Sequence, residues 1–162
     1  MTKTDDAVLR EQLTALLKGG QAHATFSDAV AHFPANRISD QPAGTPYSAW
    51  QLIEHIRITL HDLLEFVTNS EYVALEWPSG YWPQNGAPGK HESWDATVKA
   101  IHADMKSFEA LVHSPDSNLY AAIPWGENGE TLLREVLLAS DHTSYHVGEL
   151  ILLRRVLGIW KN

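Results

Sequence analysis

Two histidines lie four residues apart, at His142 and His146, in the segment 140–158, which has the pattern of one continuous helix. Side chains at positions i and i+4 lie on one face of a helix about one turn apart, so these two imidazoles can bind the same metal ion. The glutamate of the H-E-x-x-H motif is absent, which argues against a zinc protease. The spacing alone leaves two interpretations, a metal site or a pair of histidines that fill the protein core.

His146 interrupts a stripe of mostly apolar side chains along the predicted helix 130–158. Burying an unpaired imidazole costs about 1–3 kcal/mol, which a metal ion, a carboxylate, a carbonyl or a hydroxyl would offset. Glu149 is expected near the same flank, where its carboxylate would orient a ligand imidazole. Gly148 costs the helix about 1 kcal/mol relative to alanine, which is explained if another backbone or a ligand approaches closely there. The stripe follows heptad-like steps of four and three residues: Leu132, Val136, Ala139, Thr143, His146, Leu150, Leu153 and Leu157.

A third ligand is expected on a second helix, because catalytic zinc sites usually have three protein ligands and an open position. His55, in the segment SAWQLIEHIRIT, is the best candidate, since it lies beside the apolar stripe of the predicted helix 48–69. Periodicity alone does not separate it clearly from other histidines on predicted helices: His23, His32 and His102. The remaining histidines are expected on the surface or at helix ends: His61, His91 and His113.

Acidic and aromatic residues near these histidines have less specific interpretations. Asp141 and Glu54 are adjacent to candidate ligands but point elsewhere on their helices, so they are expected to be solvated or to support a ligand. Tyr145 is expected to project away from the face of His142 and His146 and to contribute packing. Three tryptophans could wall a pocket, although packing in the core and loops is their more common role: Trp50, Trp82 and Trp125.

Four helices are predicted from the spacing of apolar residues, and together they predict an all-α four-helix bundle. The first is expected to kink at the KGG of residues 18–20, and the second to begin with Ser48 as its N-cap. The connections are long for a simple up-and-down bundle, so at least one is expected to be a crossover that makes neighbouring helices parallel. A single domain over residues 1–162 follows. The predicted helices cover residues 5–33, 48–69, 92–113 and 130–158.

Composition excludes several classes of function. The 162 residues include no cysteine, which rules out disulfides, thiolate metal sites and a cysteine nucleophile. The formal net charge of −8 lacks the basic footprint of a nucleic-acid-binding protein. Neither a signal peptide nor a run of 18 apolar residues is visible, so a cytoplasmic protein without membrane contact is expected.

Two segments resemble the DinB-like superfamily of damage-inducible four-helix bundle proteins. They are YSAWQLIEHIRIT, with a tryptophan five positions before His55, and LLREVLLASDHTSYHVGELILLRRVLG, with a D-H-x-x-x-H-x-G-[EQ] run. The segment IPWGENGETLLRE is also similar to members of that group, and the resemblance extends from about residue 8 to residue 158.

The resemblance implies a long crossover between the second and third helices and a divalent metal held by His55, His142 and His146. It also implies a homodimer. Relatives include metal-dependent thiol transferases that use bacillithiol or mycothiol and a thiol-dependent maleylpyruvate isomerase.

Three hypotheses about function follow. The first is a metal-dependent hydrolase or thiol S-transferase acting on a small molecule, with a low-molecular-weight thiol as a candidate substrate. The second is a non-catalytic, stress-related metal-binding module. The third is a structural bundle whose histidines fill the core. Imidazole ligands suit zinc, nickel, iron and copper; zinc and nickel are expected first, with iron as a third candidate.

Overall fold

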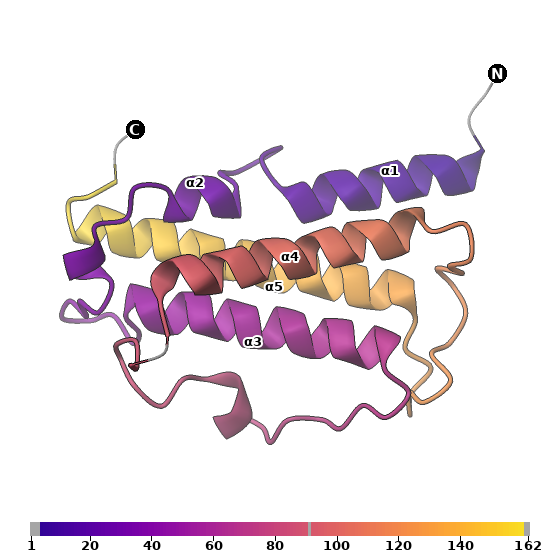
Figure 1. The fold of residues 1–162 in the computed structure, drawn as a ribbon. Helices are drawn as coiled ribbons and strands as arrows, with labels where there is room; N and C mark the ends of the chain where they lie inside the picture. Colours follow the sequence, from indigo (N-terminus) through magenta and orange to yellow (C-terminus); the bar gives the residue numbers. More distant parts are fainter. Residues whose placement is uncertain (1–3, 91, 161–162) are drawn as a thin grey trace.

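The computed structural model describes residues 4–90 and 92–160, and its long elements are all helices (Figure 1). No strand is present in these two ranges, and only an isolated bridge joins Ala122 to Thr131. The predicted all-α class is therefore confirmed. The α-helices are α1 (Asp5–Lys18), α2 (Phe26–Val30), α3 (Ala49–Thr68), α4 (Trp94–His113) and α5 (Leu132–Val156), with short 3-10 helices at Ala35–Arg37 and Ser79–Tyr81.

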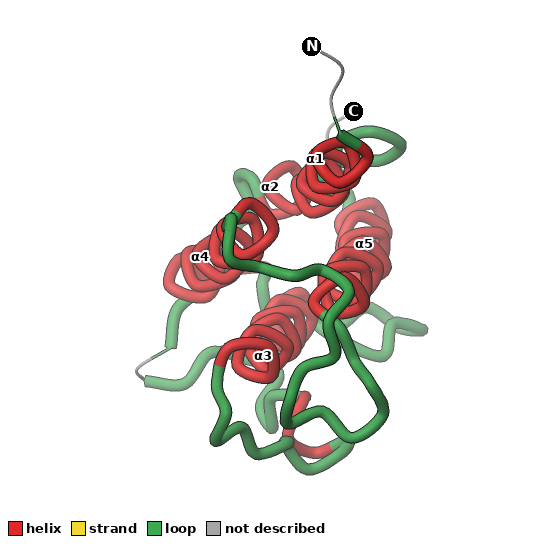
Figure 2. Tube along the Cα trace, turned by 90° about the vertical axis from the view of Figure 1, so that its right-hand side faces the viewer, coloured by secondary structure: helices red, strands yellow, loops and turns green. Residues whose placement is uncertain are grey.

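The four long helices form a bundle in which each helix packs against two neighbours. Seen end-on, α1 and α3 lie at opposite corners, and α4 and α5 occupy the other two (Figure 2). The segment 69–90 returns along the length of the bundle, and α3 and α4 run in the same direction (Figure 1). This segment is the long crossover that the sequence resemblance implies. None of the described helices is long and apolar enough to cross a membrane.

Helix boundaries follow from local capping. The hydroxyl of Ser48 accepts a hydrogen bond from the backbone N–H of Gln51, and the Gln51 side chain accepts one from the N–H of Ser48. Ser93 and Thr131 cap α4 and α5 in the same position, with one side-chain hydrogen bond each. The predicted bounds of α3, α4 and α5 agree with the observed bounds within two residues at each end.

The first predicted helix is wrong, because it is broken rather than kinked. Helix α1 ends at Lys18, and Gly19 and Gly20 both have positive φ, at +68° and +79°. Two successive residues in this conformation cannot continue a right-handed helix. The chain starts a new helix at Thr25, whose side chain forms a capping box with Asp28.

Replacing Gly20 with alanine is expected to destabilise the protein by about 1–2 kcal/mol, because a residue with a Cβ disfavours positive φ. The added Cβ would also lie only 2.9 Å from Cγ2 of Thr25. Denaturant unfolding measures the loss. Gly86→Ala is the matched control, because an added Cβ there meets nothing within 4 Å and the backbone needs no positive φ. Equal stability of the two variants would contradict this explanation.

The short helix α2 is held against α5 by one buried arginine. Nη1 of Arg154 donates to the carbonyl oxygens of Ala29 and Ala31, at 2.6 and 2.9 Å, where α2 ends. The rings of Phe33 and Trp160 lie 5.3 and 5.0 Å from the guanidinium carbon. Arg154 therefore satisfies carbonyls that the end of a helix leaves unpaired.

Candidate metal centre

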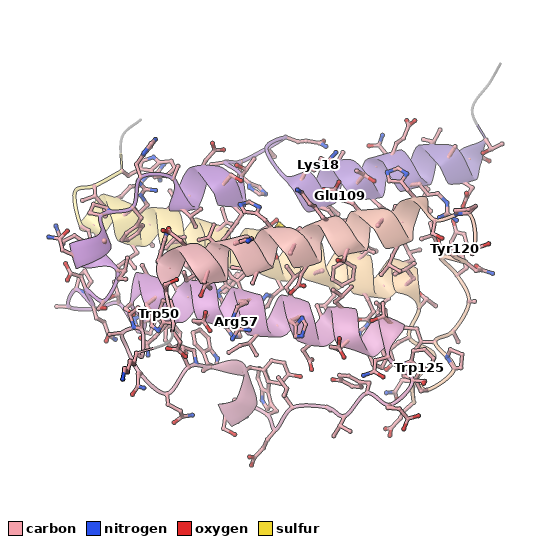
Figure 3. All side chains as sticks on the ribbon, viewed as in Figure 1. Lys18, Trp50, Arg57, Glu109, Tyr120 and Trp125 are labelled. Atoms are coloured by element: carbon pink, nitrogen blue, oxygen red, sulfur yellow. The ribbon has the colours of Figure 1, made fainter. Side chains whose placement is uncertain are left out.

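Three histidines from two helices converge in the bundle. His55 comes from α3, and His142 and His146 come from α5; one ring nitrogen of each lies within 4.8 Å of the others. His55 and His146 are buried, and His142 is half-buried. Trp50 and Arg57, labelled in Figure 3, mark the part of α3 that carries His55. The structure thus brings together the three residues that the sequence resemblance implies as ligands.

The spacing of the nitrogens fits a shared ion. Nε2 of His55 lies 3.0 Å from Nε2 of His142. Two nitrogens that are each about 2.0–2.1 Å from a tetrahedral zinc ion lie about 3.3 Å apart. The donor set is also suitable, because three imidazoles without a thiolate or carboxylate match borderline divalent metals.

In His55 and His146, the ring nitrogen that faces away from the centre, Nδ1, has a hydrogen-bond partner that fixes the orientation of the ring. Nδ1 of His55 lies 2.7 Å from the backbone carbonyl oxygen of Tyr81, to which it donates a hydrogen bond. Nδ1 of His146 lies 2.7 Å from a carboxylate oxygen of Glu149. Such partners leave Nε2 of each ring as the ligand atom and set its direction. Glu149 therefore contacts one of the three candidate ligands, His146.

Burial keeps all three imidazoles neutral at neutral pH. It lowers the pKa of His142 to about 3, with further lowering by His146 and His55. It lowers the pKa of His146 to about 4, with a smaller contribution from His55. The pKa of His55 is lowered by burial as well, although the Tyr81 carbonyl opposes this. Neutral imidazole is the form that binds metal ions.

These pKa values predict that the metal-free protein loses stability as the pH falls below about 6.5. In the unfolded chain His142 and His146 take up protons near pH 6.5, whereas in the folded chain they do so only near pH 3 and pH 4. The unfolded state therefore binds more protons in this window, and each imidazole lowers the free energy of unfolding by up to about 1.4 kcal/mol per pH unit.

Urea unfolding in the presence of a chelator, at pH 7, 6 and 5, measures this slope. The double variant His142→Leu/His146→Leu removes both groups and should show a clearly smaller loss than the wild type. An unchanged slope in the double variant would assign the acid sensitivity to other groups.

Aromatic rings from the loops cover one side of the centre. The ring of Trp82 stacks on His55, with centroids 3.8 Å apart and planes 5° apart. The ring of Tyr47 also stacks on Trp82, with centroids 3.8 Å apart and planes 17° apart. Of the two roles considered for the tryptophans, a pocket wall or ordinary packing, Trp82 therefore has the first. Trp50 instead lies fully in the core, and Trp125 donates to the carbonyl of Phe66 at the far end of α3 (Figure 3).

Two tyrosines anchor the crossover segment that reaches His55. The hydroxyls of Tyr72 and Tyr81 donate to the buried carboxylate of Asp62 at 3.0 and 2.8 Å. Burial, followed by the nearby Asp62, raises the pKa of Tyr72 to about 12, and the pKa of Tyr81 is raised as well. Both hydroxyls therefore remain protonated donors. These anchors were not found from the sequence, which gives no signal for which loop residues return to the helix.

The competing histidines lie elsewhere. His102 contacts the ring of Phe26, and His61 pairs with Asp104 at 3.3 Å. His113 is exposed at the end of α4, as expected for a residue at a helix end. His23 and His32 are exposed. His91 lies outside the described residues.

Two expectations about neighbouring residues are wrong. Glu54 is not solvated and does not contact the histidines; it is buried and accepts hydrogen bonds from Arg57 and from the hydroxyl of Thr97 on α4. Tyr145 does not project away from the face of His142 and His146. It is 65% exposed, its ring lies 4.8 Å from that of His146, and its hydroxyl hydrogen-bonds Glu149. Asp141 is exposed, as expected.

A small apolar cavity of about 120 Å³ adjoins Glu149. Tyr47, whose ring stacks on Trp82, forms part of its wall. The other lining residues are Gly44, Thr45, Pro46, Leu52, Leu152 and Leu153. The cavity therefore lies between α3, α5 and the loop before α3, next to a carboxylate that contacts a candidate ligand.

Comparison with models of protein families, with curated proteins and with solved structures finds no match to this chain. The assignment of the site therefore rests on its own geometry: an all-helical protein brings three buried or half-buried imidazoles together in an arrangement that could hold a metal ion.

Proposed function

We propose that His55, His142 and His146 bind one divalent metal ion, zinc or nickel before iron, and that the protein is a metal-dependent enzyme acting on a small molecule. The observation that carries the proposal is the convergence of three neutral imidazoles within 4.8 Å, two of them oriented by a carbonyl and a carboxylate. Membership of the DinB-like superfamily is part of the proposal, supported by the order of the helices, the crossover and the positions of the histidines.

The chemistry follows from the charge and the donor set. A divalent ion with three neutral ligands keeps its full charge and an open position, and it lowers the pKa of a bound water or thiol. The chain has no cysteine, so in a thiol S-transfer reaction the thiol arrives with a cosubstrate of low molecular weight. Glu149 holds the ring of His146 in place, and the cavity beside it accommodates a small apolar group of the substrate.

One observation favours a second function, a non-catalytic metal-binding module. Glu149 is the carboxylate nearest the centre that contacts a candidate ligand, and it is already engaged by His146 and Tyr145. A general base at the open position would have to be released from these two partners.

Elemental analysis of the purified protein tests the proposal. The wild type is expected to hold about one divalent ion per chain, and His142→Ala should lose most of it. His61→Ala is the matched control, because His61 lies on the same helix as His55 but outside the centre. Equal metal content in the wild type and His142→Ala would overturn the metal site. Bound metal without turnover of thiol or hydrolysable substrates would assign the second function.

A further inference from the structure

A second cavity, of about 640 Å³, lies where the end of α2 meets the last turn of α5 (Figure 1). It shares no lining residue with the cavity beside Glu149. Arg154, Asp28 and His32 line it, and the rest of the wall is mainly apolar: Ala24, Ala31, Pro34, Ile159 and Trp160. A cavity of this size with apolar walls and a few polar groups is typical of a site for a small organic molecule.

Arg154 brings a buried positive charge to this cavity without an acidic partner. Its side chain is only 6% exposed, and in the residues that the structure describes it forms no ion pair. Less buried arginines each pair with a carboxylate: Arg10, Arg37, Arg57 and Arg134. Burial lowers the pKa of Arg154, whereas the hydrogen bond to Glu135 raises that of Arg134. A buried cation is costly unless an anion compensates it, so the cavity favours a negatively charged ligand.

One edge of the Arg154 guanidinium is left with donors to spare. Nη1 donates to the carbonyls of Ala29 and Ala31, and the opposite edge carries the parallel N–H bonds of Nε and Nη2. Nε is shielded from solvent and has no acceptor among the described residues. The carbonyl oxygen of Ile159, which also lines the cavity, lies 3.5 Å from Nη2, longer than an ordinary hydrogen bond. Two parallel N–H donors match the two oxygens of a carboxylate.

The backbone around the cavity has uncommon conformations at two positions. His32 has a φ of +52° and is the only non-glycine residue with positive φ in the described ranges. Gly158, on the other side of the cavity, has a φ of +71°. Residues held in sparsely populated conformations gather at binding sites, where the surrounding structure keeps them in place. The wall that carries Arg154 therefore also carries the one such non-glycine residue.

We propose that this cavity binds a small organic acid with one carboxylate and an apolar body. The carboxylate accepts from Nε and Nη2 of Arg154 and replaces the long contact of Nη2 with the Ile159 carbonyl. The apolar body lies against the ring of Trp160 and its apolar neighbours. Asp28, whose carboxylate accepts hydrogen bonds from Thr25, places a negative charge on the same wall, so a ligand with a second negative group is disfavoured.

Isothermal titration calorimetry with phenylacetate tests the site. The experiment is run with a chelator present, because Arg154 lies eight residues after His146, about 12 Å along α5, and the site does not depend on the proposed metal. The wild type is expected to bind phenylacetate with a dissociation constant of about 1 mM or lower. Phenylacetamide, which lacks the charge, and inorganic phosphate, which lacks the apolar body, should bind at least about tenfold more weakly. The side-chain Nε–H resonance of Arg154 should shift during the titration with phenylacetate.

Two variants separate the cavity from the charge. Ala31→Phe fills the cavity from an exposed position and keeps the carbonyl that Arg154 uses, so it should abolish binding while circular dichroism shows unchanged helix content. Arg154→Lys keeps the charge but lacks the paired N–H edge and should weaken binding at least about tenfold. Ala110→Phe, the same substitution at an exposed position on α4 away from the cavity, is the control and should bind as the wild type does. No binding by the wild type, equal binding of the acid and its amide, or full binding by Ala31→Phe would overturn the proposal.

Discussion

His146→Leu is expected to stabilise the metal-free protein and to abolish its stabilisation by zinc. Without metal, leucine fills a buried position of the α5 stripe and removes an imidazole that burial keeps neutral, a gain of about 1 kcal/mol. With zinc at about 1,000 times its dissociation constant, the wild type gains about 4 kcal/mol. For a protein of this size that gain raises the Tm by about 8–16 °C.

The two effects have opposite signs, so thermal melts with zinc and with a chelator separate a metal site from a structural histidine. The leucine variant should melt above the wild type in the chelator and well below it in zinc. His61→Leu, a substitution of the same kind on the surface of α3, should leave the response to zinc unchanged. Equal stabilisation of the wild type and His146→Leu by zinc would show that the ion binds elsewhere.

Arg154→Met is expected to destabilise the protein by about 2–6 kcal/mol, because two backbone carbonyl oxygens lose a charged donor at a cost of about 1–3 kcal/mol each. Arg154 is only 6% exposed, and its guanidinium donates to the carbonyls of Ala29 and Ala31. Methionine keeps much of the volume but leaves these carbonyls without their donor. The loss should be concentrated at α2, which has few other polar ties to α5.

Denaturant unfolding gives the total loss, and hydrogen exchange shows where it arises. Amides of α2 should exchange faster in Arg154→Met than in the wild type. Lys106→Met is the control, because it removes an exposed cation from α4 and should change stability by less than about 0.5 kcal/mol. Arg154→Lys keeps the charge but lacks the planar guanidinium, so its loss of stability should lie between those of Lys106→Met and Arg154→Met. A loss no larger than that of Lys106→Met would contradict the role of Arg154.

Regular periodicity accounts for the elements that could be predicted. The apolar stripes of α3, α4 and α5 are long and uninterrupted by glycine pairs, so their bounds agree with the sequence within two residues. The prediction for the first segment failed because it treated residues 18–20 as a kink, whereas Gly19 and Gly20 both adopt positive φ and end the helix. Spacing reports which face of a helix is buried, but only the local backbone decides where the helix stops.

The residues of the candidate site also fall into two groups, those that helical geometry could predict and those that it could not. His142, His146 and Glu149 lie on one helix, so their common face follows from helical geometry. His55 lies on another helix, and its choice over His102 depended on a resemblance rather than on spacing. The contacts of Tyr81 and Trp82 could not be predicted, because they come from a crossover without periodicity. Similarly, the hydrogen bonds of buried Arg154 could not be predicted, because the carbonyls of Ala29 and Ala31 lie at the end of α2, which was not predicted as a separate helix.

The two oriented histidines differ in how they withstand mutation. His146 depends on the carboxylate of Glu149, so a single codon change can remove its orienting partner. His55 depends on the main-chain carbonyl of Tyr81, which every amino acid provides. The orientation of His55 therefore depends on the backbone path of the crossover and not on which side chain follows the carbonyl. Sequence drift in the crossover is tolerated at this ligand for as long as the segment still docks on α3.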